Sequence, residues 1–129
     1  MRLYDIQKAV IQKLEAAKDV IGAHISSRIS EEEPLPLVYT GEIETNPSNT
    51  KTTIGKEATQ TVYVYTHSRE QCFDIATKVE ELLSLPLEVE NARTILNEVS
   101  RVRVEQVENG MFRGEIDLRM ILGKLIGGI

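Results

Sequence analysis

The sequence predicts an α+β fold, in which a mostly antiparallel sheet of four or five strands carries two helices packed on one face. Three observations lead to this prediction. Residues 57–67 have the two-residue period of a strand, whereas the residues directly after them, 68–83, have the spacing of an amphipathic helix. A second amphipathic helix is predicted near the start of the chain, and a β-hairpin is predicted in its last third.

The composition is that of an ordinary globular chain. It has 129 residues, of which 41% are hydrophobic and 27% are charged. A chain of this length fits one domain, so we expect a single domain over residues 1–129. One cysteine excludes an internal disulfide, and neither an apolar leader nor a membrane helix is predicted, which favours synthesis in the cytoplasm. The formal net charge of −5 argues against a sequence-independent nucleic-acid binder, which would gather Lys and Arg on one face.

The first predicted helix covers residues 3–18. Apolar side chains recur there at helical spacing, and polar side chains occupy the other side. The apolar set is Leu3, Ile6, Val10, Leu14 and Ala17. Gly22 is expected to end this helical region, because glycine readily adopts the left-handed conformation that closes helices.

Two strands and a long polar segment are predicted to follow. Residues 24–29 fit a short strand and residues 37–43 fit a second one, and the acidic and proline-containing stretch between them breaks regular structure. The segment 45–56 is polar and contains Pro47 and Gly55. It is either a mobile loop or the tip of an extended hairpin.

The strand predicted over residues 57–67 has two different faces. Val62 and Val64 point to one side and Tyr63 and Tyr65 to the other, because successive side chains of a strand alternate. One helix layer covers one face, so the tyrosine face is expected to need a partner. Tyrosine is common at interfaces because it combines apolar area with a polar tip, although two tyrosines on a half-exposed strand also fit ordinary strand propensity.

The second helix is predicted to begin at Ser68, which would form a capping box with Gln71, and to end before Pro86. Its apolar stripe is predicted to be Phe73, Ala76, Val79 and Leu83. The pattern of residues 87–94 favours neither a helix nor a strand.

The register of the last hairpin follows from its sequence. A two-residue turn would pair charged residues with residues of the apolar face, so we exclude that register. A three-residue loop over residues 108–110 instead places Val107 opposite Met111 and Val102 opposite Ile116. The pairs predicted on the other face are Arg101 with Asp117, Arg103 with Glu115, and Glu105 with Arg113.

No catalytic or metal-binding pattern is recognisable in the sequence. His24 and His67 are far apart, without a Cys or His at ligand spacing. Cys72 lies near the start of a predicted helix but has no evident thiolate partner, and a small buried thiol is the expected state. Residues 54–57 superficially resemble the end of a phosphate-binding loop but lack its first glycine and its hydroxyl residue. We therefore expect no catalytic residue, no metal and no cofactor, and an assembly protein rather than an enzyme.

Taken together, these patterns resemble the tail terminator proteins, also called tail completion or tail-to-head joining proteins, of long-tailed phages and prophages. The resemblance covers nearly the whole chain. It rests on the order and spacing of six segments: the helix 3–14, the strand start at 36–39, the polar segment 45–56, the strand 62–65, the helical segment 75–82 and the closing hairpin.

The resemblance implies a virion structural protein at the head-tail interface. Such a subunit forms a hexameric ring on the last ring of the tail tube, stops tube polymerisation and presents a surface to the head connector. Its implied partners are copies of itself, the tail tube protein and the head completion or connector protein, with no membrane and no specific nucleic acid, although DNA passes through the ring. A subunit that is monomeric when free also fits this picture.

The candidate interface consists of the strand tyrosines and part of the polar segment: Tyr63, Tyr65, Thr50, Lys51, Thr52 and Thr53. Two alternatives stay open. One is a small cytoplasmic ligand-binding or regulatory α+β domain, and the other is an enzyme that uses a Glu or His. A pocket lined by convergent polar groups would favour either of them, whereas a bare sheet face would favour the ring.

Overall fold

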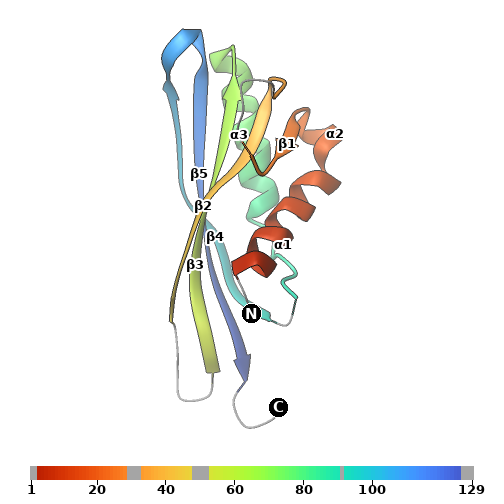
Figure 1. Ribbon diagram of the computed structural model, residues 1–129, viewed down its shortest axis with the longest axis vertical. Helices are drawn as coiled ribbons and strands as arrows, with labels where there is room; N and C mark the ends of the chain where they lie inside the picture. Colours follow the sequence, from red (N-terminus) through yellow and green to blue (C-terminus); the bar gives the residue numbers. More distant parts are fainter. Residues whose placement is uncertain (1–2, 29–32, 48–52, 91, 126–129) are drawn as a thin grey trace.

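The computed structural model describes residues 3–28, 33–47, 53–90 and 92–125. These residues form a five-stranded sheet with helices on one side, as Figure 1 shows. The elements are α1 (Leu3–Ala16), α2 (Lys18–Ile21), β1 (His24–Ser26), β2 (Leu37–Pro47), β3 (Thr53–Thr66), α3 (Arg69–Leu83), β4 (Arg93–Gln106), a 3-10 turn (Glu108–Gly110) and β5 (Phe112–Leu125). None of the described helices is long and apolar enough to cross a membrane.

The strands lie in the order β1-β2-β3-β5-β4. The short strand β1 runs parallel to β2, and every other neighbouring pair is antiparallel. The predicted α+β class with a mostly antiparallel sheet is therefore confirmed. Because β5 is made last but lies between β3 and β4, the two halves of the sheet join through it.

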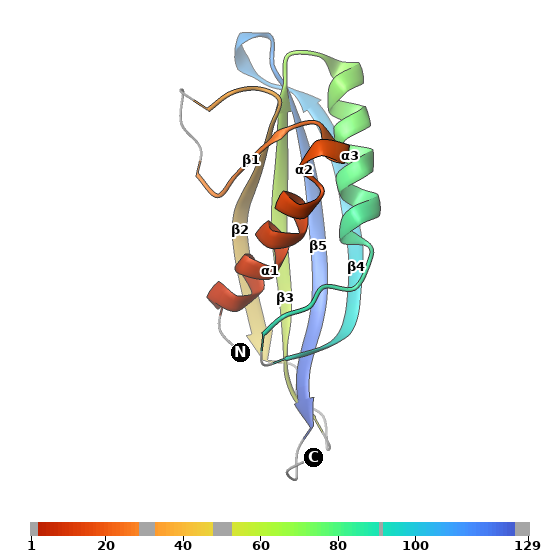
Figure 2. The same ribbon diagram turned by 90° about the vertical axis from the view of Figure 1, so that its right-hand side faces the viewer.

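All the helices cover the same face of the sheet (Figure 2). Val62 and Val64 of β3 are fully buried beneath them, whereas Tyr63 and Tyr65 point to the opposite side, which we call the open face. The division of β3 into a valine face and a tyrosine face is thus as predicted.

The core lies between the helices and the covered face. The helices contribute apolar side chains at helical spacing, and β3 and β5 contribute every second residue. Fully buried members include Ile6, Val10, Leu14, Val79, Leu83, Ile116, Leu118 and Met120.

The first helical region ends as two pieces rather than one. Helix α1 stops at Ala16, and the single turn α2 follows it. Gly22 then closes α2 in the left-handed conformation, with φ of 75°, and its N–H bonds to the carbonyl of Lys18. The predicted stop at Gly22 is confirmed, because this conformation is accessible to glycine without strain.

Helix α3 begins as predicted, and its buried stripe differs from the predicted one at a single residue. The Ser68 hydroxyl accepts a hydrogen bond from the Gln71 N–H, as a cap does. The prediction that Phe73 belongs to the buried stripe is wrong, because its side chain is 53% exposed. The other three predicted members, Ala76, Val79 and Leu83, are buried, and Cys72 and Ile75 complete the stripe in place of Phe73.

The hairpin of β2 and β3 is longer than predicted. Asn46 pairs with Glu57 and Pro47 with Lys56, so the ends of the segment 45–56 continue the ladder. Of the two interpretations of that segment, the extended hairpin holds for the described residues 45–47 and 53–56. Strand β1 is shorter than predicted and ends at Ser26.

The last hairpin has the predicted register. Val102 pairs with Ile116, the N–H of Val107 bonds the carbonyl of Met111, and Gly110 is left-handed with φ of 71°. Residues 93 and 94, in the undecided segment, belong to β4. The segment between α3 and β4 is bound to α1 by Lys13, whose ammonium group donates to the carbonyls of Leu85 and Pro86.

Candidate assembly interface

Three tyrosines form a cluster on the open face of the sheet. Tyr39 of β2 pairs with Tyr63 of β3, and their rings stack with centroids 6.0 Å apart and planes 18° apart. The ring of Tyr65 is tilted by 32° against that of Tyr63, with centroids 6.3 Å apart. All three are half-buried. The cluster is therefore a continuous aromatic surface with Tyr63 at its centre.

A β-bulge in β2 lies beside this cluster. Thr40 pairs with Val62 and Ile43 with Gln60, so Gly41 and Glu42 together stand opposite Thr61 alone. A Cβ atom on Gly41 would overlap Cε2 of Tyr63 and lie 2.8 Å from its Cδ2, which shows that the Tyr63 ring rests on the glycine backbone.

The buried side chain of Gln60 supports the bulge from the covered face. Its amide Nε2 lies 3.1 Å from each of the carbonyl oxygens of Gly41 and Glu42 and 3.0 Å from that of Thr61. Gln60 is fully buried, and its Oε1 has no hydrogen-bond partner among the described residues. The amide thus satisfies carbonyls that the bulge removes from the ladder.

Two charged residues hold the Tyr63 ring in place. The Tyr63 hydroxyl donates a hydrogen bond of 2.7 Å to the carboxylate of Glu42, and the Arg113 guanidinium lies 5.7 Å from the ring centroid. Burial, followed by the bond to Glu42, raises the pKa of Tyr63 far above its ordinary value. The same hydrogen bond is the main reason that the pKa of Glu42 is lowered. Tyr63 is therefore a donor and Glu42 an acceptor at neutral pH.

Away from the tyrosines, the open face carries paired charges beside the half-buried side chains of Leu96 and Ile121. Glu105 binds the guanidinium groups of both Arg103 and Arg113, and Arg101 lies 3.3 Å from Glu115. Farther along the sheet, Arg119 bridges Glu57 on β3 and Glu98 on β4. Because paired charges interrupt it, the open face needs less covering than a continuous apolar surface would. Its aromatic side chains, among the described residues, are those of the tyrosine cluster.

The positions of the predicted interface residues differ in how far the structure describes them. Tyr63 and Tyr65 lie together on the open face, as predicted. Thr53 is the first residue of β3, and Thr50, Lys51 and Thr52 lie outside the described residues. Sequence reasoning did not include Tyr39, although the alternation of Leu37, Val38 and Tyr39 could have indicated it. Nothing in the sequence pattern indicated the bulge.

The residues considered for chemistry are dispersed. His24 bonds Glu33 at 2.6 Å, and His67 is exposed at the end of the sheet. Cys72 is fully buried, and burial raises the pKa of its thiol, as expected for a packed cysteine. No group of three or more His, Cys, Asp or Glu residues in the described ranges could hold a metal ion.

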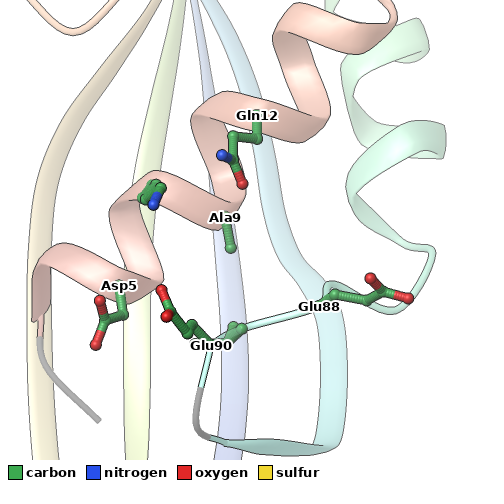
Figure 3. A pocket seen from close by; sticks show the side chains of 7 residues that line it. Asp5, Ala9, Gln12, Glu88 and Glu90 are labelled. Atoms are coloured by element: carbon green, nitrogen blue, oxygen red, sulfur yellow. The ribbon is translucent and has the colours of Figure 1, made fainter.

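A shallow polar groove lies between α1 and the segment that follows α3 (Figure 3). Its volume is about 310 Å³, and it is lined by Asp5, Lys8, Ala9, Gln12, Glu88, Val89 and Glu90. The side chain of Glu88 points away from Asp5, so the groove's carboxylates do not converge on one point (Figure 3). This arrangement lacks the convergent polar groups that a ligand-binding or catalytic site requires.

Comparison with known families identifies the chain. The family described as tail completion protein gp17 matches residues 8–123. This range includes most of α1 and all of the sheet except the last two residues of β5. The chain belongs to this family.

Solved structures share the fold of this tail completion protein. A chain of the native gene transfer agent virion is 21% identical, with a TM-score of 0.78 and coverage of 92% of this chain and 94% of that one. The gp17 protein of bacteriophage SPP1 is 22% identical, with a TM-score of 0.58 and coverage of 98% and 94%. No curated protein matches the chain.

Family membership gives this tail completion protein a structural role in the tail of a phage virion. The resemblance noted from the sequence is therefore confirmed at the level of the family. A structural role agrees with a surface that presents aromatic rings and paired charges.

Proposed function

We propose that this tail completion protein caps the tail tube. Copies of the chain form a ring, which we take to be a hexamer, on the last ring of the tube. The ring ends tube polymerisation and presents the joining surface for the head connector, and DNA passes through it. The match of the tail completion family to residues 8–123 is the observation that carries this proposal.

The tyrosine cluster is the part of the subunit that we assign to contact with a neighbouring copy. Tyrosine and arginine are enriched in the centres of protein interfaces, and here three tyrosines and Arg113 occupy one patch. A closed ring requires a surface of this kind to meet a different surface on the next copy. Residues 50–53, which come between β2 and the body of β3 in the sequence, are proposed as a second contact.

Assembly at the tube end explains why a free subunit can stay monomeric. The tube end holds several subunits side by side, which raises the effective concentration of each for its neighbour. The ring therefore forms where the tube presents its last layer. The protein is made in the host cytoplasm and ends in the virion, between tail and head.

Electron microscopy of the purified protein mixed with tail tube protein tests this function. Tubes that end in an extra ring and stop growing support termination, whereas tubes that elongate as they do without the protein contradict it. The variant Tyr63→Ala with Tyr65→Ala should keep the fold, measured by circular dichroism, and lose the capping ring. Phe73→Ala is the matched control, because it removes an exposed aromatic side chain from the helix layer instead of from the open face.

A further inference from the structure

The most constrained aromatic side chain of the open face is Tyr63. Its ring has four neighbours: the stacked ring of Tyr39, the ring of Tyr65, the Arg113 guanidinium and the backbone of Gly41. Its hydroxyl is fixed by Glu42. A ring held in this way loses little conformational entropy when a partner docks on it, which is the property of a good binding anchor.

The constraint on Tyr63 originates in the bulge. Without the extra residue in β2, only one residue would stand opposite Thr61, and Glu42 would not lie beside the Tyr63 hydroxyl. Without a glycine at position 41, the ring could not lie where it does, because even a methyl group would overlap it. The bulge itself is held by the Gln60 amide, which bonds the carbonyls of Gly41 and Glu42.

We infer that the Gly41–Glu42 bulge, supported by Gln60, is a positioning device for assembly that sets the Tyr63 ring as the anchor for a second copy of this chain. Gly41 and Gln60 act through Tyr63 and need not touch the partner. The inference rests on the proposed role of the tyrosine cluster in the ring. It goes further by naming the residues that determine whether the cluster can bind a second copy of the chain.

A double-mutant cycle between Gly41→Ala and Tyr63→Ala tests the inference. Capping of tail tubes is titrated with the parent protein, each single variant and the double variant, and folding is followed by urea denaturation of the same four proteins. In the parent background, Gly41→Ala should weaken capping at least about tenfold, the loss that corresponds to displacing one anchor side chain. In the Tyr63→Ala background, the same change should have less than about a twofold effect, because the ring that it displaces is gone.

A purely structural role for Gly41 gives a different result. It would weaken capping equally in both backgrounds, in step with lost folding stability, and this outcome overturns the inference. Unchanged capping by Gly41→Ala, when Tyr63→Ala weakens it, also overturns the inference.

Failure of the proposed function has its own signature. If Tyr63→Ala leaves capping unchanged, the tyrosine cluster is not the contact and the inference falls with it. If the parent protein does not cap tubes at all, tube capping itself is wrong, whereas coupling between Gly41 and Tyr63 in the urea measurements still reports whether the ring rests on the glycine.

Discussion

Arg103 lies directly opposite Glu115 in the β4–β5 ladder, but its guanidinium group bonds Glu105, two residues farther along its own strand. Glu105 also binds Arg113, its own directly opposite residue. The register that the sequence predicts is therefore correct, while the ion pairs within it are partly different. Glu105 is the shared acceptor of this part of the open face.

Reversing the charge of Arg103 should lower stability modestly, and adding Glu115→Lys should restore part of the loss and not all of it. Glu105 is the first partner of Arg103, and the pair with Glu115 is a secondary one. A urea double-mutant cycle at low ionic strength measures this, with Arg101 and Glu115 as the comparison pair. Complete restoration by Glu115→Lys would show that the directly opposite pair dominates.

Stability should decrease in mild acid because of the carboxylates of the open face. The pKa of Glu105 is lowered from 4.5 chiefly by its bonds to Arg103 and then to Arg113, and that of Glu57 is lowered by Arg119. When the folded pKa lies below the unfolded pKa, the unfolded chain binds more protons between the two values. The stabilisation is therefore present above pH 4.5 and is lost as the pH falls through the lowered folded values.

Urea unfolding at several pH values from about 7 to about 3 checks this direction. The variant Glu105→Gln should be less stable than the parent at neutral pH and should lose less on acidification. Equal pH dependence of the two proteins would contradict the assignment of Glu105.

Phe73→Ala should change the free energy of unfolding by no more than about 0.5 kcal/mol, since substitutions at exposed positions rarely do more. Ile75→Ala should cost about 2–5 kcal/mol, because it opens a cavity in the core. The two side chains lie two residues apart on the same helix, and they are 53% and 2% exposed. Thermal or urea denaturation of both variants compares them directly. Equal losses of stability would show that Phe73 packs in the core, as the sequence predicted.

Gln60→Met should destabilise the fold by about 1–3 kcal/mol, the cost of leaving buried carbonyl groups without a donor. The substitution keeps the length of the side chain and removes the Nε2 donor that bonds Gly41 and Glu42. Gln60→Glu should be worse, because a carboxylate is an acceptor that would face other acceptors in a buried site. The exposed Gln71 provides the control, and Gln71→Met should be near neutral in the same denaturation measurement.

Much of the fold could be predicted because local patterns agree with it. The alternation around Val62 and Tyr63 assigned the two faces of β3, and the charges of the last hairpin fixed its register. Ser68 and Gly22 were recognisable as helix boundaries because their roles depend on near neighbours in the sequence. Such signals are short-range and survive without knowledge of tertiary packing.

The errors arise where distant segments decide the structure. Phe73 is apolar, and its exposure reflects how α3 sits on β5, where Cys72 and Ala76 lie close to Gly114. The polar ends of the β2–β3 hairpin pair as strands because β5 continues alongside β3, which propensity alone does not reveal.

Only part of the candidate site could be predicted from the sequence, for the same reason. Tyr63 and Tyr65 stand on one strand and could be read together, whereas Glu42 and Arg113 reach Tyr63 from β2 and β5. The bulge depends on a buried amide on another strand, and that relationship has no signature in the spacing of residues.

The position of β5 has a consequence for how the protein is made. Among the described strands, β4 pairs with β5 alone, and β5 follows it in the sequence. While the ribosome is still translating residues 112–125, the completed β4 strand must remain unpaired, and β3 lacks one neighbour. The nascent chain therefore closes its sheet late, from its carboxyl side, and fragments that stop before β5 would expose strand edges that invite aggregation.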